Sequence, residues 1–198
     1  MAKLVVFDLD QTLIDVLPLQ DKALTRAFRS VLGFPAKWSE VDFAGRQAPE
    51  LVGELAVRKG VKLTPPVIER VLRAYRSEFA HVVPAHIRPL PGARELLERL
   101  KLAGVRCAVY TGGSGAVARE MLHRAGLSLL VYPIVSSDDA GSRVKMLNLA
   151  IRRMRKKGER VRSVVVGDSI HDVLAAKAIE AKSLAVLTGP HSRARLRK

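Results

Sequence analysis

Five short apolar runs alternate with amphipathic stretches along most of the chain. The runs are almost continuously apolar, which is typical of strands that are covered on both faces in a parallel sheet. They span residues 4–7, 105–110, 129–135, 161–166 and 183–187. The stretches with helical periodicity between them span residues 93–103, 116–125, 144–156 and 172–179. This alternation predicts right-handed βαβ units in an α/β fold with a doubly wound, Rossmann-like parallel sheet.

The segment 16–88 breaks this alternation, because it shows only helical periodicity. Helices are predicted at 17–32, 48–59 and 65–82, and the last begins with two prolines, which favour the first turn of a helix. The segment is too long for a simple crossover between strands. We therefore expect an α-helical cap domain at 16–88, inserted into a core domain formed by 1–15 and 89–198.

Composition narrows the class of protein. The chain has 198 residues, of which 48% are hydrophobic, and this excludes a wholly disordered chain. Its single cysteine, Cys107, excludes an intramolecular disulfide. No run approaches the roughly 20 apolar residues that span a bilayer, and the N-terminus does not resemble a signal peptide. We expect a cytoplasmic protein without a membrane partner.

The formal net charge of +15, from 34 basic and 19 acidic residues, favours anionic partners. Basic residues gather in 152–162 and in 193–198. No aromatic residues interleave with these runs to stack on bases, so solvated surfaces are the simpler interpretation. Phosphorylated small molecules are therefore favoured over nucleic acid, which is an unlikely partner.

Two carboxylates, Asp8 and Asp10, directly follow the first apolar run, and Thr12 follows them. Acids are costly beside a buried strand, whereas ligands of α/β proteins bind at the carboxyl ends of the strands. Such a pair could hold a divalent cation and attack an electrophile. A calcium loop is disfavoured because Leu13 and Ile14 offer no side-chain oxygen ligands.

A hydroxyl and two glycines, Thr111, Gly112 and Gly113, follow the second run. They could direct backbone N–H groups and a helix N-terminus at an anion, although a simple glycine turn would give the same pattern. Lys145 lies early in a predicted helix, where a cation opposes the helix dipole unless an anion is near. Arg143 competes for the same role.

The fourth run ends in Gly167 and Asp168, and Asp172 lies four residues further on. Asp168 could simply cap the following helix. Together, however, the four elements supply two pairs of carboxylates, a hydroxyl with backbone donors, and a cation. Phosphoryl transfer assisted by Mg²⁺ requires that set of groups.

The four elements, in this order, resemble the motifs of the haloacid dehalogenase-like hydrolase superfamily, in the subclass with a helical cap after the first strand. Phosphoglycolate phosphatases and β-phosphoglucomutases belong to that group, and the resemblance covers essentially the whole chain. Three positions depart from the family pattern. Gln11 and Glu180 stand where glycine is usual, and Met146 stands where proline is common.

The resemblance implies a Mg²⁺-dependent phosphomonoester phosphatase that works through an aspartyl-phosphate. Asp8 would be the nucleophile. Asp10 would be the general acid and base. Lys145 would neutralise charge and orient Asp8. Thr111 and Gly112 would hold the phosphoryl group together with Lys145. The residues that would hold Mg²⁺ are Asp8, Asp10 through its carbonyl, Asp168 and, indirectly, Asp172.

The cap would select the substrate, a small anionic phosphorylated metabolite that resembles phosphoglycolate, a sugar phosphate or a nucleotide. Arg46 is the best cap candidate to face it, although a solvated arginine is an alternative. Gln11 could narrow access to the nucleophile. Trp38 is expected to pack within the cap. The natural substrate and the oligomeric state, monomer or homodimer, stay open.

Three alternatives remain. A phosphomutase of the β-phosphoglucomutase type uses the same groups. A phosphonatase needs a cap lysine, for which Lys22, Lys37 and Lys59 are available. A non-catalytic, basic nucleic-acid-binding protein would account for the net charge but not for the filled catalytic positions.

Overall fold

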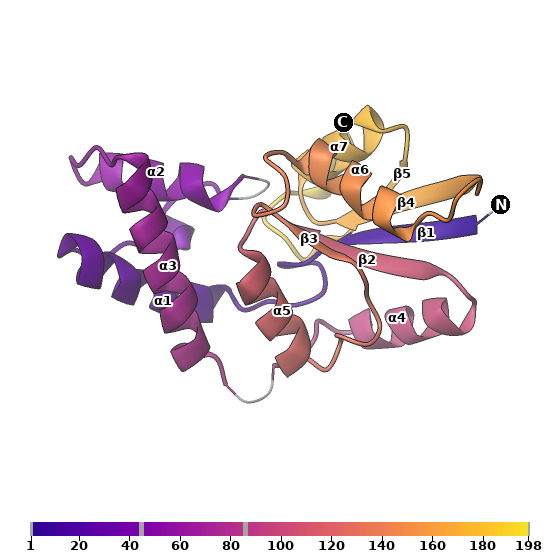
Figure 1. The fold of residues 1–198 in the computed structure, drawn as a ribbon, viewed down its shortest axis with the longest axis horizontal. Coiled ribbons are helices and arrows are strands. Elements are labelled where there is room, and N and C mark those ends of the chain that lie inside the picture. The colour runs from indigo at the N-terminus through magenta and orange to yellow at the C-terminus, as the bar shows by residue number, and fades with distance from the viewer. Residues whose placement is uncertain (1, 44–45, 85–86, 198) are drawn as a thin grey trace.

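The core of the protein is one parallel sheet of five strands, seen in a computed structural model that describes residues 2–43, 46–84 and 87–197 (Figure 1). The strands lie in the order β3-β2-β1-β4-β5 and all pairs are parallel. Their bounds are β1 Ala2–Asp8, β2 Arg106–Thr111, β3 Ile134–Ser136, β4 Val161–Gly167 and β5 Lys182–Ala185. The doubly wound α/β fold predicted from the sequence is confirmed.

Helices cover both faces of this sheet (Figure 1). The reason is visible in β1, where Val5 and Phe7 join one hydrophobic cluster and Leu4 and Val6 join the other. Alternate side chains of a strand point to opposite faces, so an apolar strand needs cover on both. One face is covered by α4 Ala93–Leu102 and α5 Gly115–Arg124, and the other by α6 Arg143–Met154 and α7 Ile170–Ala178. A short α8, Arg193–Leu196, follows β5.

The third strand differs from its prediction at 129–135. Only Ile134–Ser136 forms the strand β3, and Leu129 lies in an exposed turn. Pro133 has no backbone N–H to donate to a ladder, so regular pairing begins after it. Apolar character in this segment therefore reflects both surface residues and a short strand.

The described residues of the inserted segment form four helical elements: α1 Leu17–Leu32, the 3₁₀ turn η1 Trp38–Glu40, α2 Ala48–Arg58 and α3 Pro65–Val82. They lie beside the carboxyl ends of the strands (Figure 1). The two connections to the sheet run side by side, because the Leu90 N–H donates to the Leu13 carbonyl at 2.9 Å. This supports the division into core and cap, which stays a prediction; its outer bounds, 1 and 198, lie outside the described residues.

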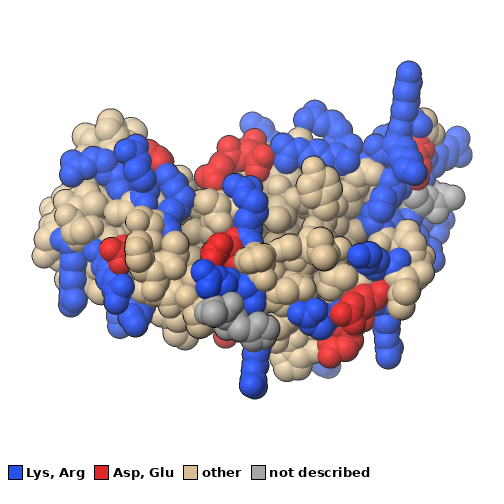
Figure 2. All heavy atoms as spheres, turned by 60° about the horizontal axis from the view of Figure 1, so that its bottom comes forward, with Lys and Arg blue, Asp and Glu red and all other residues tan. Residues whose placement is uncertain are grey.

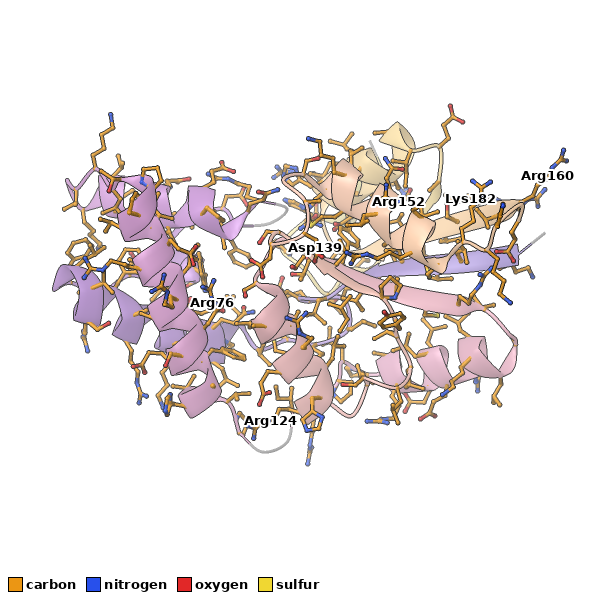
Figure 3. The ribbon with its side chains drawn as sticks, viewed as in Figure 1. Arg76, Arg124, Asp139, Arg152, Arg160 and Lys182 are labelled. Carbon is orange, nitrogen blue, oxygen red and sulfur yellow. The ribbon has the colours of Figure 1, made fainter. Side chains whose placement is uncertain are left out.

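Basic side chains are distributed over both the core and the cap (Figure 2, Figure 3). Lys and Arg side chains are spread over the face drawn in Figure 2, with smaller acidic groups between them. Arg160 and Lys182 lie at the end of the core that is far from the cap helices (Figure 3). Among the described helices, none has both the length and the apolar character needed to cross a membrane.

Candidate active site

Three buried carboxylates meet at the carboxyl edge of the sheet. Asp8 ends β1, Asp168 follows β4, and Asp172 lies in the first turn of α7. Oxygen atoms of the three lie within 4.8 Å of one another, and each residue is at most 6% exposed. Parallel strands place their carboxyl ends at one edge, so residues 160 positions apart in the chain become neighbours.

The pKa values in this cluster reflect burial and crowding. Burial raises the pKa of Asp8 well above its ordinary value, and the charges of Asp172 and Asp168 raise it further, while Arg143 lowers it. Burial and the Asp172 charge raise the pKa of Asp168 to about 6. The ionised form of a carboxyl group is disfavoured both by the loss of water on burial and by like charges nearby. The surroundings therefore compensate the negative charge of the ionised carboxylates only in part.

Arg143 is the cation at the centre of this cluster. Its Nη1 lies 3.2 Å from Asp8 Oδ1 and 3.2 Å from the Tyr110 hydroxyl, and it also pairs with Asp172 Oδ1. The guanidinium carbon lies 5.3 Å from the centre of the Tyr110 ring, which adds a cation–π contact. Burial alone would lower the pKa of Arg143, but the charges of Asp172, Tyr110 and Asp8 raise it above its ordinary value.

Lys145 does not join the cluster, in contrast to the expectation from the sequence. Its side chain is exposed, and its backbone N–H donates to the Ser142 hydroxyl that caps α6. Because α6 begins at Arg143, the side chain in its first position faces the site. Two residues further along a helix turns about 200°, so Lys145 faces solvent.

Asp172 is held by contacts on both of its oxygens. Oδ2 accepts from the Ser169 N–H at 2.9 Å and from the Ser169 hydroxyl at 2.6 Å, and the Asp172 N–H donates to the Ser169 hydroxyl, which completes the capping box of α7. Oδ1 accepts from Tyr110 and Arg143. A Cβ on Gly167 would overlap the Asp172 carboxylate, so only glycine fits there. The arrangement fixes Asp172 as a support for Arg143 and the cluster.

Asp168 is more open than Asp172. Its Oδ1 accepts from the Thr12 hydroxyl at 3.2 Å, and a Cβ on Gly189 would overlap Oδ2. The glycine after β5 therefore leaves room beside this oxygen. Asp8 and Asp168 are thus the carboxylates that could hold a cation, and oxygen atoms are the ligands that Mg²⁺ prefers.

Asp10 faces the same cavity but lies outside the three-carboxylate cluster. Its Oδ1 accepts from Gln20 Nε2 of α1 at 2.8 Å. Burial raises the pKa of Asp10 to about 6, although hydrogen bonds from Gln20 and Thr111 and the charge of Arg143 lower it. Gln20 was missed by the sequence analysis. Its signal is a polar residue on the face of α1 that otherwise buries Ala23, Leu24 and Ala27.

The loop after β2 forms the other side of the site. Thr111 is buried, and its hydroxyl accepts from the Gly113 N–H at 3.0 Å. The Gly112 carbonyl accepts from the Ala48 N–H at 3.3 Å, so the cap contacts the core here. A Cβ on Gly112 would lie 2.6 Å from the Arg46 carbonyl. Glycine at this position therefore permits the close approach of the cap loop.

A cavity of about 100 Å³ lies between these groups and the cap. Cavities that take drug-sized ligands are larger, roughly 300–1,000 Å³, so this one suits a small molecule. Gln11 and Arg46 line it, whereas Lys22, Lys37 and Lys59 do not, and a role of the first two in substrate selection stays a prediction. Apolar and aromatic cap residues, absent from the predicted site, complete the wall: Trp38, Phe43, Ala48, Leu51, Leu72 and Tyr75.

Gln11 has a backbone φ of +58°. This left-handed conformation favours glycine, and the Thr188 hydroxyl donates to the Gln11 carbonyl in that turn. Glu180, the other position that departs from a family glycine, has a φ of +56° after the end of α7. Both departures therefore keep the backbone shape that glycine would adopt without strain.

Comparisons with known proteins agree with this geometry. The family model described as haloacid dehalogenase-like hydrolase matches residues 5–186. The chain belongs to the haloacid dehalogenase-like hydrolase family. This match spans the Asp8 motif, the Thr111 loop and the Asp168 motif.

Curated relatives extend over nearly the whole chain. A phosphoglycolate phosphatase of Agrobacterium fabrum is 29% identical over 195 residues, which cover 96% of this chain and 82% of that protein. A glyceraldehyde 3-phosphate phosphatase of Pyrococcus abyssi is 25% identical over 199 residues, which cover 93% of this chain and 81% of that protein. The crystal structure of a hydrolase from Pseudomonas syringae matches with a TM-score of 0.78 and 26% identity, over 98% of this chain and 88% of that one.

Together, the family and these relatives confirm the predicted enzyme class. This haloacid dehalogenase-like hydrolase is an enzyme of the phosphatase type.

Proposed function

We propose that this hydrolase is a Mg²⁺-dependent phosphomonoester phosphatase that forms an aspartyl-phosphate on Asp8. The observation that carries the proposal is the pairing of two acids in different environments. Burial raises the pKa of both acids, but Asp8 lies in the cluster with Asp168 and contacts Arg143 at 3.2 Å, whereas Asp10 accepts from Gln20 of α1 at 2.8 Å. Two acids whose surroundings differ in this way suit a nucleophile and a proton donor.

In the first step, the Asp8 carboxylate attacks phosphorus, and the bond between phosphorus and the ester oxygen breaks. Protonated Asp10 gives its proton to that oxygen, so the alcohol leaves neutral. A carboxyl with a pKa of about 6 retains its proton in part of the molecules near neutral pH. Gln20 orients the Asp10 carboxyl for this transfer.

In the second step, Asp10 takes a proton from water, and the water oxygen attacks phosphorus. The bond between phosphorus and Asp8 breaks, which releases inorganic phosphate and restores the Asp8 carboxylate. Thr111 and the Gly112 N–H contact the phosphoryl oxygens through both steps. Arg143, in the role that the sequence assigned to Lys145, orients Asp8 and offsets charge.

The site fits a divalent cation on the chemistry of its donors. The Arg143 guanidinium pairs with the carboxylates of Asp8 and Asp172, while those of Asp10 and Asp168 lie at the same cavity, and burial raises the pKa of Asp8, Asp10 and Asp168. Bound Mg²⁺ would offset this excess of negative charge and that of the phosphoryl oxygens. Asp8, Asp168 and the Asp10 carbonyl would hold it, and Asp172 would support them.

We further propose that segment 16–88 works as a cap that admits a small substrate and then excludes water. The contact between Ala48 and Gly112 supports this role. The relatives' names include one ester of an acid and one of an aldehyde, so they support phosphomonoesters as a class. The phosphomutase and nucleic-acid alternatives have no specific contact in their favour.

The test is phosphate release from a panel of phosphomonoesters, with and without Mg²⁺, for the wild type and Asp8→Asn. We expect the variant to lose activity on the order of a thousandfold or more, because asparagine is not a nucleophile. Acid-quenched wild type should carry a phosphoryl group that Asp8→Asn lacks in its intact mass. Turnover that needs a bisphosphate activator would instead indicate a phosphomutase.

Asp15→Asn is the matched control. Asp15 is exposed, it lies seven residues further along the chain, and its Oδ1 accepts from the Leu17 N–H, which asparagine can also do. We expect this variant to keep activity within about twofold and the same unfolding midpoint, because burial raises the pKa of Asp10 more than the Asp15 charge does. Full activity of a folded Asp8→Asn would contradict the proposal.

A further inference from the structure

The cap side of the cavity is an apolar and aromatic surface. Trp38 and Tyr75 meet edge to face, with ring centres 5.4 Å apart and planes at 86°, and both are at most 6% exposed. Phe43, Leu51 and Leu72 extend this wall. Because both rings are buried and packed against each other, the wall keeps its shape and offers apolar area to a ligand.

The cation that the cap brings to this cavity is already paired. Arg46 Nε and Nη2 donate to Glu50 Oε1 at 2.9 and 2.6 Å, and Nη1 lies 2.6 Å from Glu54 Oε2. Glu54 is shared with Arg58, at 2.7 Å. Two arginines and two glutamates thus form a neutral network, which we name the Arg46 network. Among the described cap residues that line the cavity, no other is a cation.

The apolar wall and the Arg46 network together determine which leaving group of a phosphomonoester this cavity favours. A second anionic group on the substrate, such as a carboxylate, would lose water against the apolar wall without gaining a cation. An uncharged group would gain free energy from the burial of its apolar surface against this wall. The phosphate itself remains on the core side with Thr111, Gly112 and Arg143.

We propose that the natural substrate is a phosphomonoester of a small, uncharged alcohol with an aliphatic or aromatic face, which packs against Trp38, Leu51, Leu72 and Tyr75. This inference rests on the proposed phosphatase function and deepens it. It separates this chain from enzymes whose substrate carries a second negative charge. Arg46, the cap cation that lines the cavity, is already paired within the Arg46 network and is not available to that charge.

The first test compares kcat/KM for four esters with Mg²⁺ present. Phosphoglycolate and 2-hydroxyethyl phosphate are nearly the same size and differ in the carboxylate, while propyl and benzyl phosphate add apolar surface. We expect the three uncharged leaving groups to exceed phosphoglycolate at least tenfold, with benzyl or propyl phosphate the best. Equal values, or a preference for phosphoglycolate, would overturn the inference and leave the phosphatase proposal intact. Hydrolysis of none of the esters by the folded protein would overturn both.

The second test releases the paired cation. In Glu50→Gln/Glu54→Gln, Arg46 loses both carboxylates, so we expect kcat/KM for phosphoglycolate to rise several-fold relative to propyl phosphate. The matched control is Glu69→Gln, which breaks the pair with Arg76 at 2.8 Å on α3; neither of these two residues lines the cavity. The control should leave the ratio of the two esters unchanged. An unchanged ratio in the double variant would contradict the role of the Arg46 network.

Discussion

The core and cap halves of the cavity are built on different physical principles. The core half gathers Asp8, Asp168 and Asp172 around Arg143, where burial and like charges shift the pKa values. In the cap half, Trp38 and its apolar neighbours form the wall, and the charges cancel within the Arg46 network. In the core half the negative charges outnumber the positive ones, whereas the cap half presents an apolar wall beside a network whose charges cancel.

The largest expected effect separates the two candidate cations of the core half. Arg143→Ala should lower kcat about 100-fold or more, because it removes the guanidinium that contacts Asp8. Lys145→Ala should stay within about twofold of the wild type, because that side chain is exposed. Steady-state kinetics on the best ester at saturating Mg²⁺ measures both, and circular dichroism checks folding. A larger loss in Lys145→Ala would show that α6 presents a different face to the substrate.

This pair of residues also marks where prediction from sequence ends. Apolar runs that stop at carboxylates give the fold and place Asp8, Asp10 and Asp168 at one edge, because parallel strands share that edge. The choice between Arg143 and Lys145 depends on where α6 begins, and each residue turns a helix by about 100°. The sequence pattern leaves the first residue of a helix uncertain by one or two positions, and a shift of that size decides whether Arg143 or Lys145 faces the site.

The cap half was predictable in its helices but not in its surface. Periodicity places α1 and α3 at the observed bounds, yet the face that lines the cavity depends on how three helices pack together. Arg46 lines the cavity, but its partners on α2 became visible only with the fold. Trp38 does pack in the cap as predicted, and it forms the wall as well.

The next effect contrasts the pH dependence of the two halves. The folded pKa of Asp168, about 6, lies above its ordinary value of 3.8, so the folded state binds protons more tightly than the unfolded state. The stability that the raised pKa of Asp168 contributes to the folded state is fully present below about pH 4 and is lost as the pH rises through about 6. Asp168→Asn should therefore stabilise the metal-free protein at pH 7, by about 1–3 kcal/mol, in urea unfolding.

Mg²⁺ and a cap variant provide the controls for this prediction. If Mg²⁺ binds the folded state through the Asp168 carboxylate, as we propose, it should raise the unfolding midpoint of the wild type at pH 7 and have little effect on Asp168→Asn. Glu54→Gln should act with the opposite sign: hydrogen bonds from Arg46 and Arg58 lower the pKa of Glu54, so its contribution is lost as the pH falls. If the free energy of unfolding depends on pH in the same way in both variants, the core and cap halves do not differ electrostatically as we propose.

The smallest effect concerns Gln11, which lies where the core loop meets the cavity. A left-handed backbone costs a non-glycine residue about 1–2 kcal/mol, which substitution by glycine would recover. Glycine also makes the unfolded chain more flexible, and this offsets part of the stabilisation. Gln11→Gly and Glu180→Gly should therefore each stabilise the fold by about 0.5–1 kcal/mol in urea unfolding. Gln11→Gly should also change KM, since its side chain lines the cavity, whereas Glu180→Gly should not. If both variants leave KM unchanged, substrate selection belongs to the cap wall, and Gln11 serves only to shape the turn beside Asp10.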